Sequence, residues 1–161
     1  MRFREQVVTT ADADAAFSFL VDFGNLRTWD PSVRRVRRLT RGAVGLDTRF
    51  RVDMSFLGLP SSLDYRVEEF EPPRRAVLVG TTLVCTATDT IVVEPMAEGC
   101  KVTWQADIHF AGPIALLDPL FAWLFSSSVK AAVQEMRYCL DRLEGRRPVK
   151  KASARKAARR K

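Results

Sequence analysis

The chain has little cysteine, a single histidine and no long hydrophobic run, and each shortage excludes a class of protein. The three cysteines are odd in number and form no CxxC pair, so the sequence predicts neither a disulfide framework nor a structural zinc site. The one histidine, His109, excludes mechanisms that need two. No apolar run reaches the roughly 18 residues of a membrane-spanning helix. The longest candidate, residues 114–125, is broken by an Asp-Pro pair.

The sequence also lacks the short motifs of several enzyme classes. It has no Gly-rich phosphate loop, no serine in a nucleophile elbow and no cluster of metal ligands. The N-terminal residues MRFREQVV contain no apolar segment like that of a secretory signal. We therefore expect a cytoplasmic protein that holds neither a metal nor a cofactor.

Positive charge is what the sequence has in excess, and it is concentrated at one end. The formal net charge is +7 and the sequence pI is about 9.8. Of 26 basic residues, nine follow Gly145, where there are no acids, which leaves 17 basic against 19 acidic residues in 1–145. Residues 146–161 contain only alanine and one valine as apolar residues, too few to offset the entropy of ordering. We expect one domain at 1–145 followed by a disordered basic tail at 146–161.

Two interpretations of this basic tail remain open. Basic segments bind nucleic acid or an anionic surface non-specifically by counterion release, and the tail has no aromatic residue to stack on bases. The alternative is a solubilising extension without a dedicated partner. A second basic segment, residues 34–41, alternates arginine with apolar residues, as in an exposed strand or part of an anionic-partner surface. The candidate contacts in the tail are Arg146, Arg147, Lys150, Lys151, Arg155, Lys156, Arg159, Arg160 and Lys161.

Hydrophobic periodicity predicts a β-rich domain that ends in a long helix. A strand is expected at about 2–9, a helix at 11–22 with Thr10 as its N-cap, and a short helix or turn at 23–29. After residue 32 the period changes to two, which predicts six further strands in an antiparallel meander with one apolar face. Steps of three and four then predict a helix over 119–144.

The ends of this last helix are marked by particular residues. Asp118 is expected to cap its N-terminus, with Pro119 at the first helical position, and Gly145 supplies a left-handed C-terminal position. A curved sheet must cover its apolar concave face, and only this helix is long enough to do so. One helix does not fill a wide sheet, so either bulky side chains or a cavity for a hydrophobic ligand must occupy the remainder.

This order of elements resembles the START-like helix-grip superfamily (SRPBCC), and most closely its polyketide cyclase/dehydrase and lipid-transport branch. The likeness covers about residues 3–144 and none of the basic tail. The residues that carry it are Ala11 to Phe17, Asn25-Leu26 with Trp29 and Pro31, Gly45, Tyr65 to Val67 with Phe70 to Arg74, Gly112, Leu140 and Leu143.

The resemblance implies an α+β helix-grip fold, in which a seven-stranded curved antiparallel sheet wraps around the long C-terminal helix, with two short helices after the first strand. It also implies an internal cavity for a hydrophobic ligand. Because the superfamily includes lipid carriers, hormone receptors and aromatases/cyclases, the likeness does not determine the chemistry.

The residues expected to line such a cavity are apolar side chains on the inner face, any one of which can equally be plain core. They are Trp29, Phe50, Met54, Phe56, Tyr65, Trp104, Ile108, Phe110, Phe121, Leu124, Phe125 and Met136. Tyr65 is the best polar candidate, because a buried tyrosine hydroxyl needs a partner and can orient a ligand. Thr86, Thr88 and Thr90 can add hydroxyls to the lining or lie on an exposed face.

Catalytic chemistry has few candidates, namely Tyr65 and His109. Simple hairpin register places Cys85 opposite His109, which makes a Cys/His pair geometrically conceivable on the polar face. Alternation places Asp53 and Asp107 on that polar face too, and Asp30 can cap the turn before Pro31. The pattern therefore predicts no carboxyl group inside the apolar hollow.

Three functions follow from these observations. The leading hypothesis is a non-enzymatic module that binds, or binds and transports, a small hydrophobic molecule such as a lipid or polyketide. The second is a cyclase/aromatase-like enzyme, which requires a buried acid or base. The third is an interaction protein that its basic tail localises on nucleic acid.

Overall fold

The computed structural model describes residues 1–56 and 58–143. The predicted basic tail and the predicted C-terminal position of Gly145 lie outside these residues. The elements, in chain order, are β1 (Arg2–Thr9), α1 (Ala13–Val21), the 3-10 helix η1 (Phe23–Asn25), α2 (Leu26–Trp29), β2 (Val33–Arg38), β3 (Arg49–Phe56), β4 (Leu59–Glu71), β5 (Arg75–Thr81), β6 (Cys85–Pro95), β7 (Cys100–Phe110), the 3-10 helix η2 (Gly112–Leu117) and α3 (Asp118–Asp141).

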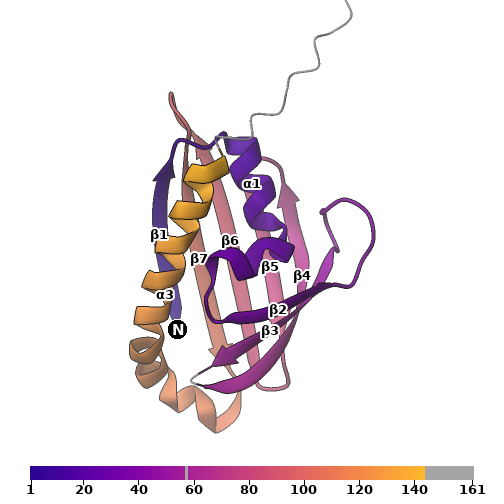
Figure 1. The fold of residues 1–161 in the computed structure, drawn as a ribbon. Helices are drawn as coiled ribbons and strands as arrows, with labels where there is room; N and C mark the ends of the chain where they lie inside the picture. Colours follow the sequence, from indigo (N-terminus) through magenta and orange to yellow (C-terminus); the bar gives the residue numbers. More distant parts are fainter. Residues whose placement is uncertain (57, 144–161) are drawn as a thin grey trace, which may run out of the picture.

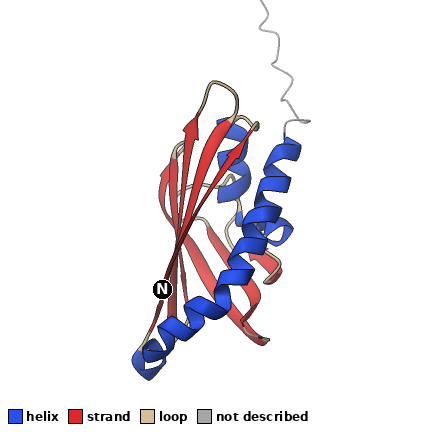
Figure 2. Ribbon diagram, turned by 90° about the vertical axis from the view of Figure 1, so that its left-hand side faces the viewer, coloured by secondary structure: helices blue, strands red, loops and turns tan. Residues whose placement is uncertain are grey.

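The seven strands form one antiparallel sheet in the order β1-β7-β6-β5-β4-β3-β2. Figure 1 shows α1, α2 and α3 on the same face of this sheet, with β2 and β3 curling toward them. In Figure 2 the sheet is strongly twisted and α3 crosses its concave side. The predicted fold, a curved seven-stranded sheet around a long C-terminal helix, is confirmed.

The core forms where the alternating apolar residues of the sheet meet the helices. On β6 the inward residues include Ala87, Ile91 and Val93, all at most 6% exposed, and the residues of opposite phase, Thr88, Thr90 and Val92, face outward. From α3, the side chains of Met136 and Leu140 are fully buried against this layer. The C-terminal half of α3 therefore seals the sheet, and the remaining space lies toward its N-terminal half.

Three local predictions were wrong. The N-cap of α1 is Asp12, not Thr10, because the Asp12 carboxylate accepts hydrogen bonds from the backbone N–H groups of Asp14 and Ala15 at 3.0 and 3.3 Å. The N-cap of α3 is Leu117 rather than Asp118, without a side-chain cap bond. The regular part of α3 ends at Asp141, three residues earlier than predicted.

Strand register overturns the proposed Cys/His pair. Cys85 lies opposite Phe110, and the residue opposite His109 is Thr86. Because neighbouring residues on a strand face opposite sides, this shift of one residue places Cys85 and His109 on different faces of the sheet.

Among the described residues, no helix has both the length and the hydropathy to span a bilayer.

Candidate functional site

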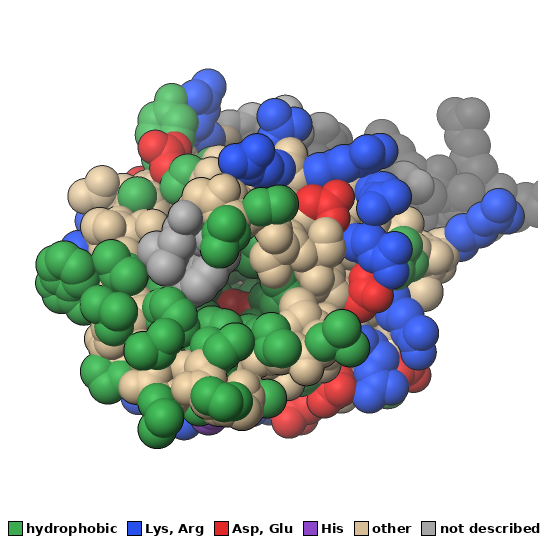
Figure 3. Space-filling model, turned by 90° about the horizontal axis from the view of Figure 1, so that it is seen from below, with side chains coloured by type: hydrophobic (Ala, Val, Ile, Leu, Met, Phe, Trp, Pro, Cys, Tyr) green, Lys and Arg blue, Asp and Glu red, His purple; other side chains and the backbone are tan. Residues whose placement is uncertain are grey.

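Two adjoining pockets lie between the concave face of the sheet and the N-terminal half of α3. The inner pocket has a volume of about 110 Å³ and the outer one about 370 Å³. Seen from below, the molecule is hollowed here, and an acidic side chain is visible inside a ring of hydrophobic ones (Figure 3). Five residues line both pockets, so the two are parts of one hollow: Met54, Tyr65, Ala87, Ile108 and Phe125.

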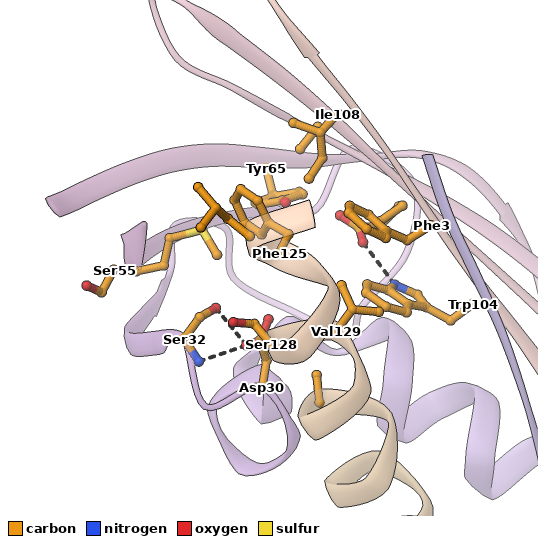
Figure 4. Close-up of a pocket in the computed structure, with 16 residues that line it drawn as sticks. Phe3, Asp30, Ser32, Ser55, Tyr65, Trp104, Ile108, Phe125, Ser128 and Val129 are labelled. Carbon is orange, nitrogen blue, oxygen red and sulfur yellow. Dashed lines mark hydrogen bonds between the residues drawn. The ribbon is translucent and has the colours of Figure 1, made fainter. Parts of the chain in front are cut away.

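Apolar side chains from both layers form most of the wall. β7 contributes Ile108 and Trp104, and α3 contributes Phe125 and Val129 from the opposite side (Figure 4). Aromatic contacts join the layers: the Phe110 and Phe121 ring centroids are 5.2 Å apart, and those of Phe3 and Phe125 are 6.3 Å apart. A ligand in this space would bury most of its surface against carbon.

One buried carboxyl group interrupts this apolar wall. Asp89, on β6, is 7% exposed and lines the inner pocket. The indole Nε1 of Trp104 donates a hydrogen bond of 2.9 Å to Asp89 Oδ1. The pKa of Asp89 is raised to about 7, mainly by burial and to a smaller extent by the nearby charges of Asp30 and Asp107, while hydrogen bonds from Trp104 and Tyr65 act in the opposite direction. Asp89 therefore exchanges its proton near neutral pH.

Tyr65 brings a hydroxyl group to the same carboxyl. The side chain is 7% exposed, and burial followed by the charge of Asp89 raises the pKa of Tyr65 well above its usual value, so the hydroxyl keeps its proton. Tyr65 lies opposite Gly80 on β5, and a β-carbon at Gly80 would be 2.6 Å from Tyr65 Cζ. The Tyr65 ring therefore occupies space that is open only because residue 80 is a glycine. An edge-on contact with Phe23, at 5.0 Å between centroids, also holds the ring.

A second carboxyl group, Asp30, lies on the wall after α2. Its Oδ1 accepts hydrogen bonds from the backbone N–H and the hydroxyl of Ser32, at 2.9 and 2.6 Å (Figure 4). Burial raises the pKa of Asp30, and the two bonds from Ser32 lower it in part. Asp30 therefore both caps the turn at Pro31 and places its carboxyl group in the inner pocket.

The polar groups of the inner pocket include two acids, Asp89 and Asp30, set in a wall that is otherwise mostly apolar. None of the described residues that line either pocket is lysine, arginine or histidine. At pH values below about 7, Asp89 is neutral and can donate its proton; at higher pH it is an anion held by Trp104 and Tyr65. Asp89 therefore has the pKa expected of a group that moves protons at physiological pH.

The structure brings together most of the residues predicted to line a cavity. Three others are packed in the core away from both pockets: Trp29, Phe50 and Met136, each at most 1% exposed. The Trp29 ring meets that of Trp104 edge-on, at 6.0 Å between centroids. The side chain of another predicted lining residue, Phe56, lies outside the described part of the structure. The eight that line a pocket are Met54, Tyr65, Trp104, Ile108, Phe110, Phe121, Leu124 and Phe125.

Asp89 is the functional candidate that the sequence analysis missed, and the expectation of a hollow without a carboxyl group was wrong. The signal was present, because Asp89 is in phase with Ile91 and Val93, whose side chains are buried. The three threonines considered instead, Thr86, Thr88 and Thr90, have the opposite phase and lie on the outer face.

The remaining polar candidates lie outside the hollow. His109 is exposed on the outer face. Asp107 pairs with Arg2 there, and Asp53 accepts a hydrogen bond of 2.6 Å from the Ser62 hydroxyl. None of the described residues forms a group of acids, cysteines and histidine that could hold a metal ion.

Comparisons with known proteins agree with the fold. The family model described as polyketide cyclase / dehydrase and lipid transport matches residues 1–146. Among solved structures, a START superfamily protein from Mycobacterium smegmatis has a TM-score of 0.73 at 14% identity, over 88% of this chain and 98% of that one. TTHA0849 from Thermus thermophilus has a TM-score of 0.71 at 18% identity, over 87% and 97% of the two chains. No curated protein matches the chain significantly.

One similar structure is larger than this chain. The di-domain ARO/CYC StfQ from the steffimycin biosynthetic pathway has a TM-score of 0.67 at 16% identity. The match covers 89% of this chain but 52% of that one, so the chain spans about half of StfQ. At such low identities the likeness shows the fold alone. None of these matches supports the nucleic-acid hypothesis, and the tail on which that hypothesis depends lies outside the described residues.

Proposed function

Because the chain belongs to the polyketide cyclase/dehydrase and lipid transport family, we propose that it binds one small, largely apolar molecule in the hollow between the sheet and α3. The observation that carries the proposal is the apolar wall with a buried acid, Asp89, held by Tyr65 and Trp104 at its inner end. Ligand sites of this kind have volumes of about 300–1,000 Å³, and the outer pocket alone has about 370 Å³.

We also propose an orientation for the ligand. Its apolar body would fill the outer pocket, where about 25 cal/mol of stabilisation is expected for each Å² of apolar surface removed from water. Its polar group would enter the inner pocket and bond to Asp89 or Tyr65. A single polar contact of this kind fixes which end of a ligand enters first, while the apolar contacts provide most of the affinity.

Binding can be tested with the neutral dye N-phenyl-1-naphthylamine, whose fluorescence rises in apolar surroundings. We expect one bound dye per chain, and an affinity at least tenfold lower in Ala87→Phe, because Ala87 lines both pockets and a phenyl ring there occupies them. Thr86→Phe is the matched control, since the neighbouring residue faces outward on the same strand. Equal dye affinity in the two variants, both shown to be folded by circular dichroism, would contradict the proposal.

A second function, proton transfer to a bound carbonyl compound, is favoured by one observation, the pKa of about 7 of the buried Asp89. In its neutral form Asp89 can protonate a carbonyl oxygen. The resulting carboxylate can then take a proton from the adjacent carbon, which converts the ketone to its enol with no net change in protons. Cyclisation and dehydration of polyketides both proceed through such enols.

The neutral bicyclic ketone 2-tetralone tests this second function. In deuterated buffer at pH 7, wild-type protein should exchange the ketone's C1 hydrogens faster than buffer alone, as followed by proton NMR. Asp89→Asn should lose at least nine-tenths of that acceleration and still bind the dye, because the amide cannot take up the proton. If the variant exchanges as fast as wild type, Asp89 is not a catalytic acid, and the binding function stands without it.

A further inference from the structure

The end of the molecule where the hollow opens carries most of its exposed large hydrophobic side chains. Thirteen such residues are exposed in the described structure, and eight of them lie at this end, at the start of β4, in the β5–β6 turn, in η2 and in the first turns of α3. We call these eight the apolar rim: Leu59, Leu83, Val84, Ile114, Leu116, Leu117, Leu120 and Trp123.

The antiparallel topology explains why these separate segments meet. The β3–β4 turn, the β5–β6 turn and the end of β7 all occur at the same end of a meander, opposite the β4–β5 and β6–β7 turns. Figure 1 shows this end at the bottom, where η2 and the start of α3 join it. Leu59, Val84 and Ile114 belong both to the rim and to the lining of the outer pocket. The apolar rim therefore surrounds the entrance to the hollow.

The shape of the rim distinguishes it from an ordinary protein interface. Five of its eight residues lie on η2 and the first turns of α3, with Leu116 84% and Trp123 72% exposed, and the other three come from the β5–β6 turn and the start of β4. A protein partner would need a surface that matches all of these segments at once, whereas the fluid boundary of a bilayer accepts them without a matching shape. Contiguous apolar surface of this kind is rare on monomeric proteins and marks a contact with protein, ligand or membrane.

Charge is distributed as a lipid surface would require. Residues 111–124 contain one charged residue, Asp118, so little charge would have to enter the headgroup region. Strand β2 carries four exposed arginines, and it starts toward this end of the sheet, where Val33 lies opposite Met54. One of them, Arg34, donates a hydrogen bond of 3.4 Å to the Ser55 hydroxyl, and Ser55 lines the inner pocket. Figure 3 shows basic side chains next to the hydrophobic ring around the hollow.

From these observations we propose that the apolar rim docks on the surface of a membrane that carries anionic headgroups. The rim side chains reach the boundary between headgroups and acyl chains, Trp123 lies at the interfacial depth that tryptophan favours, and the β2 arginines meet lipid phosphates. The entrance to the hollow then faces the bilayer. The docking is independent of which ligand occupies the hollow.

Trp123 makes the proposal directly measurable. Of the three tryptophans, Trp29 and Trp104 are at most 7% exposed, so quenchers dissolved in lipid report on Trp123. The full chain is mixed with vesicles of phosphatidylcholine and phosphatidylglycerol (7:3) whose acyl chains are brominated. We expect co-sedimentation, a blue-shifted emission and strong quenching, and weaker binding to phosphatidylcholine alone.

Substitutions in the rim test whether the rim, and not another part of the chain, is responsible for vesicle binding. Leu116→Ser with Leu120→Ser should weaken vesicle binding at least tenfold, whereas the matched control Leu39→Ser with Leu46→Ser, two exposed leucines outside the rim, should leave it unchanged. Ala87→Phe should bind vesicles normally, which keeps this proposal distinguishable from the proposed function. Sedimentation without quenching of Trp123 would assign binding to the basic tail and overturn the proposal. If the protein is a dimer in solution and the rim substitutions dissociate it, the rim binds a second copy of this chain, and the membrane proposal is overturned.

Discussion

Wild-type protein should lose about 2–3 kcal/mol of stability between pH 5 and pH 8, and Asp89→Asn should lose far less. The folded protein holds a proton on Asp89 up to about pH 7, whereas the unfolded chain releases it near pH 3.8. Between these values the folded state binds more protons, so the free energy of unfolding falls as pH rises. At about 1.4 kcal/mol per pKa unit, the full difference is about 4 kcal/mol, most of it above pH 5.

Asparagine suits this test because it has nearly the same shape as aspartate, can still accept the hydrogen bond from Trp104, and has no proton to release in this pH range. The amide also has no charge to desolvate. Asp89→Asn should therefore be more stable than wild type at pH 8, and close to it at pH 5. Part of the pH dependence should remain, because burial raises the pKa of Asp30 as well.

Urea unfolding at pH 5 and pH 8 measures this effect. Glu98→Gln, an exposed carboxyl-to-amide change in the β6–β7 turn, is the control and should keep the wild-type pH dependence. Equal pH dependence in Asp89→Asn and wild type would mean that Asp89 is ionised in the folded protein throughout this range. The second proposed function would then lose its acid.

The fold could be predicted because its signals are local. Alternation in residues 85–110 and three- and four-residue steps after Pro119 each depend on a few neighbouring side chains. Once the strands are antiparallel and one face is apolar, the helices must lie on that face, and only the last helix is long enough to cross it. The helix ends were harder, since a cap depends on backbone geometry: both Thr10 and Asp12 suit an N-cap, and Asp12 is the one whose carboxylate reaches the free N–H groups.

The site was harder to predict because it depends on a polar side chain, Asp89, at a strand position where the alternation predicts an apolar one. An acid in phase with buried apolar residues, such as Asp89, is read as an interruption of the strand rather than as an inward-facing group. The partners that make its burial tolerable, Tyr65 and Trp104, come from two other strands. Nothing in the local sequence connects these three residues, and only the register of β4 to β7 brings them together.

Gly80 offers a test of how tightly that arrangement is held. Its backbone is ordinary strand, yet a β-carbon would be 2.6 Å from Cζ of the Tyr65 ring and 2.7 Å from both ε-carbons. The ring cannot move away freely, because it is buried against Phe23. Gly80→Ala should therefore destabilise the protein by about 2–3 kcal/mol, in the range seen for overpacked cores. Gly45→Ala, where the nearest atom is 4.0 Å away, should be close to neutral.

A double-mutant cycle with Tyr65→Ala shows whether the ring is the cause. Without the ring, a methyl group at Gly80 has space, and alanine is favoured over glycine in a strand by about 0.5–1 kcal/mol. Gly80→Ala should then be neutral or stabilising, which gives a coupling energy of about 2–3 kcal/mol between the two positions. Dye binding should fall in Gly80→Ala, because the displaced ring enters the hollow that it now borders. Equal losses of stability in both backgrounds would show that Gly80 does not seat Tyr65. The alignment of its hydroxyl with Asp89 would then need another cause.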